Sequence, residues 1–345
     1  MHDLVYLSFA KDGSYGCTYL AEINLHKGEN RMLSPSTQHI IRRSRLIMPA
    51  NEQRFIEKAF LRNADAIVLD LEDSVPNSEK ESTRLLIKNQ IPIVSKGGSD
   101  VFVRVNHSDK HLEKDIEAAI WPGLHGIVLP KIENPEEVAF VDALISRLEE
   151  ERGIPKNYIK ISAIIETVKG YLNMSEALKV STRLDSLTLG AEDFSLDSGI
   201  DISEDTYHAL LIPRMGILFE ARSKNLLPLG TMGSIATFSD LEEYKENVKL
   251  SYKHGFLGAS CIHPNQVEIL NKYFSPSDST VQQAKGIIQA FEDAIANGRA
   301  STTFEGNMID YPHYRKAQQI LERNHQIEAI EERKRQAREI ALGGK

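Results

Sequence analysis

The sequence predicts an α/β protein folded as a (β/α)8 TIM barrel with a C-terminal helical lid extension. From residue 44 onward, short β-branched or aliphatic runs alternate with longer amphipathic segments, the pattern of repeated β–α units around a parallel sheet. Eight such runs occur, and eight parallel strands with their crossovers close into a barrel. A chain of 345 residues, 41% of them hydrophobic, accommodates one large barrel with an appendage.

The expected strands follow one another along the proposed catalytic barrel, residues 42–274. The segments between them place apolar residues at the i, i+3 and i+4 spacing of helices, as in Asn51–Arg62, Pro135–Glu150 and Asp240–Lys253. Because a helix separates successive strands, the strands are expected to run parallel. They are predicted at Arg45–Met48, Ala66–Leu71, Val101–Val105, Gly126–Leu129, Ile159–Ile165, Ser186–Leu189, Leu227–Met232 and Ala259–Ile262.

Residues 275–345 are expected to form the helical extension. A helical stretch after Pro276 ends at the stop signal Asn297–Gly298, and the charged segment Pro312–Arg338 again has helical spacing. Between them, Thr302–Tyr311 shows no clear periodicity. The extension is therefore predicted to be a helical hairpin with a functional loop, the lid, in its middle.

Residues 1–41 lack a clean pattern of elements and are treated as an N-terminal extension. Three interpretations stay open: a tail, an artefact of an upstream start site, or an ordered strand or helix that plugs the barrel bottom. Asp3 and Lys11 interrupt the stretch where a signal peptide needs apolar residues, and no run approaches the roughly 20 apolar residues of a membrane span. We expect neither export nor anchoring in a membrane.

Composition narrows the class of partner. A net charge of -8 and a pI near 5.8 argue against a nucleic-acid-binding surface, which needs clustered excess Lys and Arg. Cys17 and Cys261 are far apart and outside any CxxC arrangement, so neither a disulfide framework nor a zinc cluster is indicated. A cytoplasmic protein acting on a small molecule is expected.

Polar residues follow most of the expected strands, at the barrel end where catalytic sites lie. Carboxylates from three strands at one rim would repel one another unless a cation or a buried arginine neutralised them. Few oxygen ligands favour Mg²⁺ over a calcium cage, and the absence of paired His or Cys argues against zinc. We assign Glu166 and Asp193 as direct ligands, although either carboxylate alone is equally typical of a helix N-terminus. The polar segments are Asp70–Asp73, Arg104–Asn106, Pro130–Glu133, Glu166–Thr167, Gly190–Asp193 and His263–Gln266.

Three basic side chains at this rim have alternative interpretations. Arg104 ends an apolar run and needs an anion, either a substrate carboxylate or the neighbouring Asp70 and Glu72, and the two are weighted equally. Lys131 is assigned to a rim salt bridge in preference to a Schiff base. His263 can be a base, but a hydrogen-bonded histidine at the barrel mouth is the commoner case.

The same residues carry an extensive resemblance to a known family. The strings RSRLIMPAN, ADAIVLDLEDSVP, VFVRVN, GIVLPKIE, AIIETVKGYLN, LTLGAEDF, GFLGASCIHPNQV and TTFEGNMIDYP occur in order between Arg43 and about Gln319. In this the chain resembles the citrate lyase beta subunit-like family of the HpcH/HpaI aldolase superfamily, which includes malyl-CoA and citramalyl-CoA lyases. The resemblance implies a magnesium-dependent carbon–carbon lyase.

The resemblance also implies roles for individual positions. Glu166 and Asp193 match the magnesium ligands, and Arg104 matches the arginine that holds the keto-acid part of the substrate. Asp310 matches the lid aspartate that acts as general acid or base, which family members often take from a neighbouring subunit. A homotrimer or hexamer with lid swapping is thus expected.

For the coenzyme A thioester, the resemblance places Ile47 against the thioester arm and Arg54 and Lys58 at its phosphates. Leu229 and Gly230, within the seventh expected strand, complete the assigned substrate-binding set. The chain departs from the family in three places: Ala50 replaces the usual turn glycine, Glu52 stands where arginine is frequent, and the segment after Leu229 lacks the common acidic residues.

The expected reaction is retro-aldol, Claisen-type cleavage of a 3-hydroxyacyl-CoA to acetyl-CoA and a 2-keto acid. Two related alternatives stay open: a citrate lyase beta subunit that depends on a carrier-bound thioester, and a metal-dependent aldolase acting on free 2-keto acids, which Glu52 favours slightly. A non-enzymatic protein on a decayed barrel is the least favoured, because the assigned ligands and the lid aspartate are all present.

Overall fold

The computed structural model describes residues 7–9, 15–17, 40–107, 110–201, 203, 206–235 and 239–343, in two units, Met1–Leu33 and Ser34–Lys345. In the first unit, β1 (Leu7–Phe9) and β2 (Tyr15–Cys17) form an antiparallel pair with Ser8 opposite Gly16. Most of the predicted N-terminal extension, residues 1–41, lies outside the described residues. The three interpretations of this extension therefore stay predictions.

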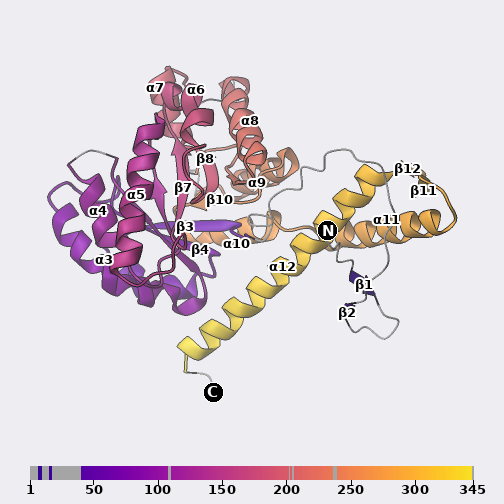
Figure 1. Ribbon diagram of the computed structural model, residues 1–345, viewed down its shortest axis with the longest axis horizontal. Helices are drawn as coiled ribbons and strands as arrows, with labels where there is room; N and C mark the ends of the chain where they lie inside the picture. Colours follow the sequence, from indigo (N-terminus) through magenta and orange to yellow (C-terminus); the bar gives the residue numbers. More distant parts are fainter. Residues whose placement is uncertain are drawn as a thin grey trace. The chain divides into compact units, whose positions relative to one another are not determined.

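The second unit contains an eight-stranded parallel sheet, which Figure 1 shows with its helices outside it. The sheet order is β10-β3-β4-β5-β6-β7-β8-β9. Backbone hydrogen bonds from Leu257 to Pro228 (3.0 Å) and from Gly230 to Gly258 (2.9 Å) join the two outer strands and close the barrel. The predicted fold is therefore confirmed. The strands are β3 (Ser44–Pro49), β4 (Ala66–Asp70), β5 (Asp100–Arg104), β6 (Gly126–Leu129), β7 (Lys160–Ile165), β8 (Leu184–Leu189), β9 (Leu227–Leu229) and β10 (Ala259–Cys261).

Helices follow the strands as predicted, with one exception. The expected helix Asn51–Arg62 is broken into α2 (Gln53–Ile56) and the 3₁₀ turn η1 (Ala59–Leu61). Its side chains do not supply a continuous apolar face, because Phe55 and Leu61 stay exposed. The other helices around the barrel are α3 (Lys80–Val94), α4 (Leu112–Ala119), α5 (Pro135–Glu151), α6 (Val168–Ala177), α7 (Ala191–Ser198), α8 (Tyr207–Ser223), α9 (Leu241–His254) and α10 (Pro264–Tyr273). No helix within the described ranges is long and apolar enough to cross a membrane.

The chain beyond the barrel forms two helices joined by a short hairpin. They are α11 (Asp278–Ala296) and α12 (Tyr311–Ala341), and the hairpin consists of β11 (Thr302–Phe304) and β12 (Asn307–Ile309). The segment without periodicity is thus an antiparallel hairpin, which turns through Glu305 and Gly306, both with positive φ. Phe291, Ile309 and Tyr314 form a small hydrophobic core of their own here. We call residues 302–310 the lid hairpin.

Candidate active site

The alternation of side chains along the strands carries polar groups to the mouth of the barrel. On β4, Ala66 and Val68 lie in the small hydrophobic cluster inside the barrel, whereas Ile67 and Leu69 pack in the larger outer core. Successive side chains of a strand point to opposite faces, so Asp70 is the next inward position. By the same count, Arg104 follows Phe102 on β5, and Glu166 follows Ile164 on β7.

Arg104 is fixed by a two-point ion pair. Its Nε lies 2.7 Å from Asp70 Oδ1 and its Nη2 lies 2.8 Å from Asp70 Oδ2. Burial works to raise the pKa of Asp70, but its hydrogen bonds to Arg104 prevail, and the pKa stays below its ordinary value. Nη1 lies 3.1 Å from Glu72 Oε2, without hydrogen-bond alignment, and 3.3 Å from Asp73 Oδ2. The ion-pair alternative for Arg104 is thus observed.

Glu166 is a buried carboxylate with an unsatisfied oxygen. Its residue surface is 5% exposed, and Oε2 has no hydrogen-bond partner among the described residues. Burial raises the pKa of Glu166 to about 8, and the nearby Glu72 and Asp193 carboxylates add to the shift. Burial likewise raises the pKa of Glu72 to about 7, although Arg104 opposes the shift. The rim thus concentrates carboxylates that ionise together only at a cost.

Gly190 lies against the side chain of Glu166 and leaves room for it because a glycine has no Cβ. A Cβ on Gly190, which follows β8, would lie 2.4 Å from Glu166 Cγ and 2.5 Å from Glu166 Oε1. The Gly190 amide also donates to the carbonyl of Ile165 at 2.9 Å. Asp193 follows in the first turn of α7, with its side chain 40% exposed. The two assigned metal ligands therefore come from adjacent strand ends.

Lys131 links these carboxylates. Its Nζ lies 3.4 Å from Asp193 Oδ1 and 3.8 Å from Glu72 Oε1. Partial burial works to lower the pKa of Lys131, but Asp193 and Glu72 outweigh it and raise the pKa. These two ion pairs are the rim salt bridge that the sequence predicts for Lys131. His263 caps α10, where its Nδ1 accepts a hydrogen bond from the Asn265 amide at 3.2 Å, which is the commoner of its two expected roles.

A cavity of about 610 Å³ opens at this mouth. Its polar wall includes Arg104, Glu166 and Asp193, and the assigned Ile47, Leu229 and Gly230 lie in its wall as well. Sequence reasoning missed Arg214, a buried residue of α8 that also lines the cavity. No strand-end position marks Arg214, because it reaches the cavity from inside a helix.

Three assigned residues are not in the cavity wall. Arg54 pairs with Glu52 at 3.1 Å and is 73% exposed, and its guanidinium stacks on Phe55, which does line the cavity. Lys58 lies just beyond α2. Asp310 lies between β12 and α12 and bonds to His313. None of the cavity-lining residues belongs to the C-terminal extension, so a single chain does not bring Asp310 to the mouth among its described residues.

The rim side chains fit a hard divalent cation. Glu166 offers a buried oxygen without a partner among the described residues, and burial, with the neighbouring carboxylates, raises its pKa, a shift that a bound cation would oppose. Within the described part of the chain, no group of three or more His, Cys, Asp or Glu side chains is arranged to hold a metal. A two-carboxylate site that leaves places for substrate and water is what Mg²⁺ accepts.

Binding of such a cation is expected to depend on pH. A metal needs ionised carboxylates, so the affinity for Mg²⁺ should fall by up to about tenfold per pH unit as pH drops below the Glu166 pKa of about 8. Calorimetric titration of the protein with MgCl2 between pH 6 and 9 measures this. Glu72→Gln removes one neighbouring charge and should move the loss of affinity to lower pH. An affinity that stays constant from pH 6 to 8 would contradict the assignment of Glu166.

Known proteins are similar to this chain over most of its length. The profile of the HpcH/HpaI aldolase/citrate lyase family matches residues 43–264, and that of the C–C bond lyases of the TIM-barrel fold matches residues 218–327. The citrate lyase subunit beta of Leuconostoc mesenteroides subsp. cremoris is 32% identical over 81% of this chain and 92% of its own length. The human mitochondrial citramalyl-CoA lyase is 32% identical over 84% of this chain and 87% of its own length.

A solved structure shares the fold. The CitE protein of Mycobacterium tuberculosis, in complex with magnesium, acetoacetate and coenzyme A, is similar with a TM-score of 0.67. It is 24% identical, and the match covers 83% of this chain and 99% of that chain. The match extends past the barrel, because 83% of this chain is more than residues 1–274, which end with the barrel.

Proposed function

Because the chain belongs to the HpcH/HpaI aldolase/citrate lyase family of carbon–carbon lyases, we propose that it is a Mg²⁺-dependent lyase for a 3-hydroxyacyl-CoA. The substrate is of the citramalyl-CoA or malyl-CoA type, and the products are acetyl-CoA and a 2-keto acid. The observation that carries the proposal is that one cavity is lined both by Glu166, a buried carboxylate with an unsatisfied oxygen, and by Arg104, whose guanidinium is anchored by Asp70.

Glu166 and Asp193 would hold the metal ion. When bound, Mg²⁺ supplies Lewis-acid polarisation of the oxygens at the bond that breaks. Lys131, which lies 3.4 Å from Asp193 and 3.8 Å from Glu72, offsets part of the negative charge of the rim. This arrangement supports metal-assisted chemistry on an anionic substrate.

Arg104 would orient the keto-acid end. Asp70 occupies Nε and Nη2 and thereby fixes the guanidinium plane. Nη1 lies 3.1 Å from Glu72 Oε2 without hydrogen-bond alignment. It also lies 3.3 Å from Asp73, whose side chain is 63% exposed, and an exposed pair of this kind is worth little. A substrate carboxylate can therefore replace Asp73 at Nη1 while Asp70 keeps the arginine in place.

The thioester arm would run over the apolar part of the cavity. Ile47 and Leu229 supply this surface, and Gly230 leaves space beside them. A volume of about 610 Å³ suits the reacting end of the substrate, so the nucleotide of coenzyme A has to lie outside the cavity. Its phosphates would then meet Lys58 and Arg54, whose guanidinium stacks on the cavity residue Phe55.

Asp310 would exchange the proton with the enolate carbon of the thioester. Its hydrogen bond to His313 keeps its pKa below the ordinary value in the exposed lid hairpin, so it is ionised before docking. Transfer into a mouth lined with carboxylates would raise that pKa and favour the protonated acid that cleavage requires. Because no described residue of the C-terminal extension lines the chain's own mouth, a second copy in a homotrimer or hexamer would supply Asp310.

The ion pair of Glu52 with Arg54 favours a second candidate. It partly neutralises a cation assigned to the coenzyme A phosphates, at 3.1 Å. The same catalytic rim would then serve a carrier-bound thioester, as in a citrate lyase beta subunit, or a free 2-keto acid.

Release of 2-keto acid from citramalyl-CoA and malyl-CoA, with Mg²⁺ and with EDTA, tests the proposal. We expect release that EDTA abolishes and added Mg²⁺ restores, because Glu166 and Asp193 cannot supply the metal's polarising charge themselves. No release from either thioester, with Mg²⁺ binding intact, would favour the carrier-bound or free-acid substrate. Release unaffected by EDTA would contradict a metal-dependent mechanism.

A further inference from the structure

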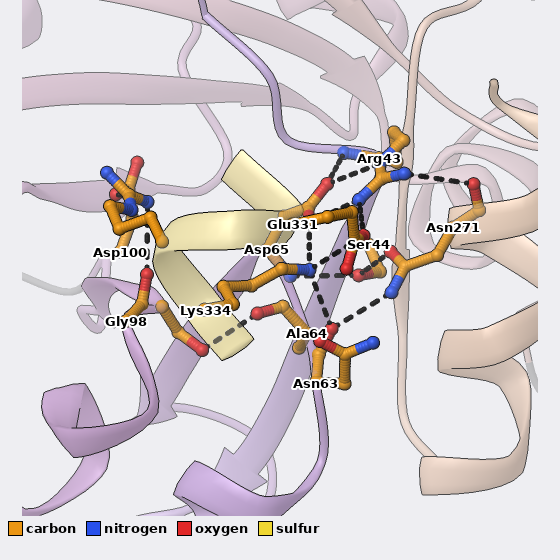
Figure 2. A network of polar contacts seen from close by, with 12 residues as sticks. Arg43, Ser44, Asn63, Ala64, Asp65, Gly98, Asp100, Asn271, Glu331 and Lys334 are labelled. Carbon is orange, nitrogen blue, oxygen red and sulfur yellow. Dashed lines mark hydrogen bonds and ion pairs between the residues drawn. The ribbon is translucent and has the colours of Figure 1, made fainter. Parts of the chain in front are cut away.

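We propose that the buried ion pairs between α12 and the bottom of the barrel are a positioning device for Asp310, acting from the opposite end of the same helix. The proposal rests on the function proposed above for Asp310. Lys334, Arg43 and Asp65 form the centre of this set of contacts, which we call the α12 clamp (Figure 2).

Lys334 is the residue through which α12 enters the clamp. Its side chain is fully buried, and Nζ lies 2.6 Å from Asp65 Oδ1 and 3.0 Å from the carbonyl oxygen of Asn63. Nζ also lies 3.2 Å from Glu331 Oε1, one turn earlier on α12. Three oxygens therefore fix the ammonium group, two of them from the barrel.

Arg43 completes the clamp from the barrel side. Its Nε and Nη2 lie 2.8 and 2.9 Å from the two oxygens of Asp65, and Nη2 also bonds to Glu331 of α12. Asp65 is thus shared by two cations, which together overcome its burial and lower its pKa to about 2. The carboxylate stays ionised, and the clamp stays intact, across the physiological pH range.

The clamp lies at the end of the barrel opposite the proposed site. Arg43 and Asp65 directly precede β3 and β4, whereas Arg104 and Glu166 end β5 and follow β7. Backbone contact is close there as well, since a Cβ on Gly98 would lie 3.1 Å from Lys334 Cα. A role for the clamp in catalysis therefore has to act through α12.

Buried ion pairs of this kind define orientation more than they add stability. Removing two charges from water costs about as much as their attraction returns, so an apolar contact would attach the helix equally well. An ion pair with fixed hydrogen-bond directions instead admits one rotation and one register of α12. That selectivity is what a distant catalytic group at the other end of the helix requires.

Because α12 is long, its orientation at the clamp determines the position of Asp310 at its other end. The helix is continuous from Tyr311 to Ala341, and Asp310 is its N-cap residue (Figure 1). At 1.5 Å per residue, Lys334 lies about 36 Å along the helix from Asp310. A tilt of about 2° at the clamp would move Asp310 by roughly 1.3 Å, and a misplacement of about 1 Å can cost about a hundredfold in rate.

The lid end of the arm is stiff enough to transmit such a tilt. Phe291, Ile309 and Tyr314 pack into one core, with the Phe291 and Tyr314 rings 5.0 Å apart. The Tyr314 hydroxyl also donates to Glu292 Oε1 at 3.0 Å. The hairpin, α11 and the first turn of α12 thus form one packed unit.

A double-mutant cycle on the full-length protein tests the proposal. Lys334→Met keeps most of the length of the side chain and removes its charge. We expect kcat for keto-acid release to fall about 10- to 100-fold with KM little changed, because the mouth itself is untouched. In the Asp310→Asn background, the same substitution should have no further effect on kcat, since no positioned acid remains.

The control is Arg183→Met. Arg183 is also fully buried at the start of a strand, where it pairs with Asp142 and Glu149 of α5 and not with α12. It should lower the melting temperature about as much as Lys334→Met and leave kcat of the folded protein unchanged. If Lys334→Met does not fold, the milder double substitution Arg333→Gln/Arg338→Gln removes contacts to Gly98 and Asn63 and should show the same cycle with a smaller effect.

The outcomes separate the two proposals. Equal fractional losses of kcat from Lys334→Met in both backgrounds would make the clamp merely structural. Full kcat in Lys334→Met, with Asp310→Asn impaired, would remove the positioning role alone. Full kcat in Asp310→Asn would overturn the proposed role of Asp310 and the positioning inference with it.

Discussion

Replacement of Glu166 by Gln is expected to abolish Mg²⁺ binding and to lower keto-acid release by about a thousandfold or more. The amide cannot supply the charge that the metal needs, and loss of about 4 kcal/mol of metal-dependent stabilisation corresponds to that factor. Calorimetric titration with MgCl2 and steady-state release assays measure the two effects. Glu133→Gln is the matched control, because Glu133 follows the neighbouring strand β6 but pairs with Lys169 outside the cavity.

The same substitution is expected to stabilise the metal-free protein at high pH. Glu166 has a folded-state pKa raised from 4.5 to about 8, so ionisation penalises the folded state increasingly as pH rises through that interval. The penalty grows by about 1.4 kcal/mol for each pH unit within it. The melting temperature of the Gln variant in EDTA should match wild type near pH 4.5 and exceed it by several degrees near pH 8.5. A difference that does not grow with pH would contradict a buried, uncompensated carboxylate.

The strands and the rim were predictable because both depend on local pattern. Ala66, Val68 and Asp70 alternate with apolar residues that face the helices, so one short run determines both a strand and the direction of its terminal carboxylate. The same holds for Phe102 and Arg104. In a buried strand whose side chains alternate between the two faces of the sheet, the sequence order and the barrel geometry together place the terminal polar side chain at the mouth.

Other features depend on contacts between distant segments. Lys334 lies in the run Glu331-Glu332-Arg333-Lys334-Arg335, which has the composition of a solvated helix, yet Lys334 is fully buried against Asp65. The partner is 269 positions away, so no local pattern indicates it. Arg214 was missed for a related reason, since a helix outside the sheet carries it into the cavity.

Replacement of Asp310 by Asn is expected to reduce kcat by about 10²- to 10⁴-fold, the usual contribution of a positioned acid or base, with KM little changed. Stability should change little, because the Asp310 side chain is 37% exposed and makes an exposed contact to His313. Steady-state kinetics and thermal unfolding measure these effects. A similar loss in His313→Ala with intact Asp310 would instead assign the effect to disruption of the helix start.

A mixing experiment determines which copy supplies Asp310. Asp310→Asn protein has an intact rim, and Glu166→Gln protein has an intact lid hairpin. If the hairpin completes a neighbour's mouth, randomly mixed 1:1 trimers should regain about one quarter of wild-type activity, since about one site in four then combines both wild-type residues. Each variant alone keeps only its low residual activity. If Asp310 serves its own chain, no mixed oligomer contains a complete site, and mixing restores no activity at any ratio.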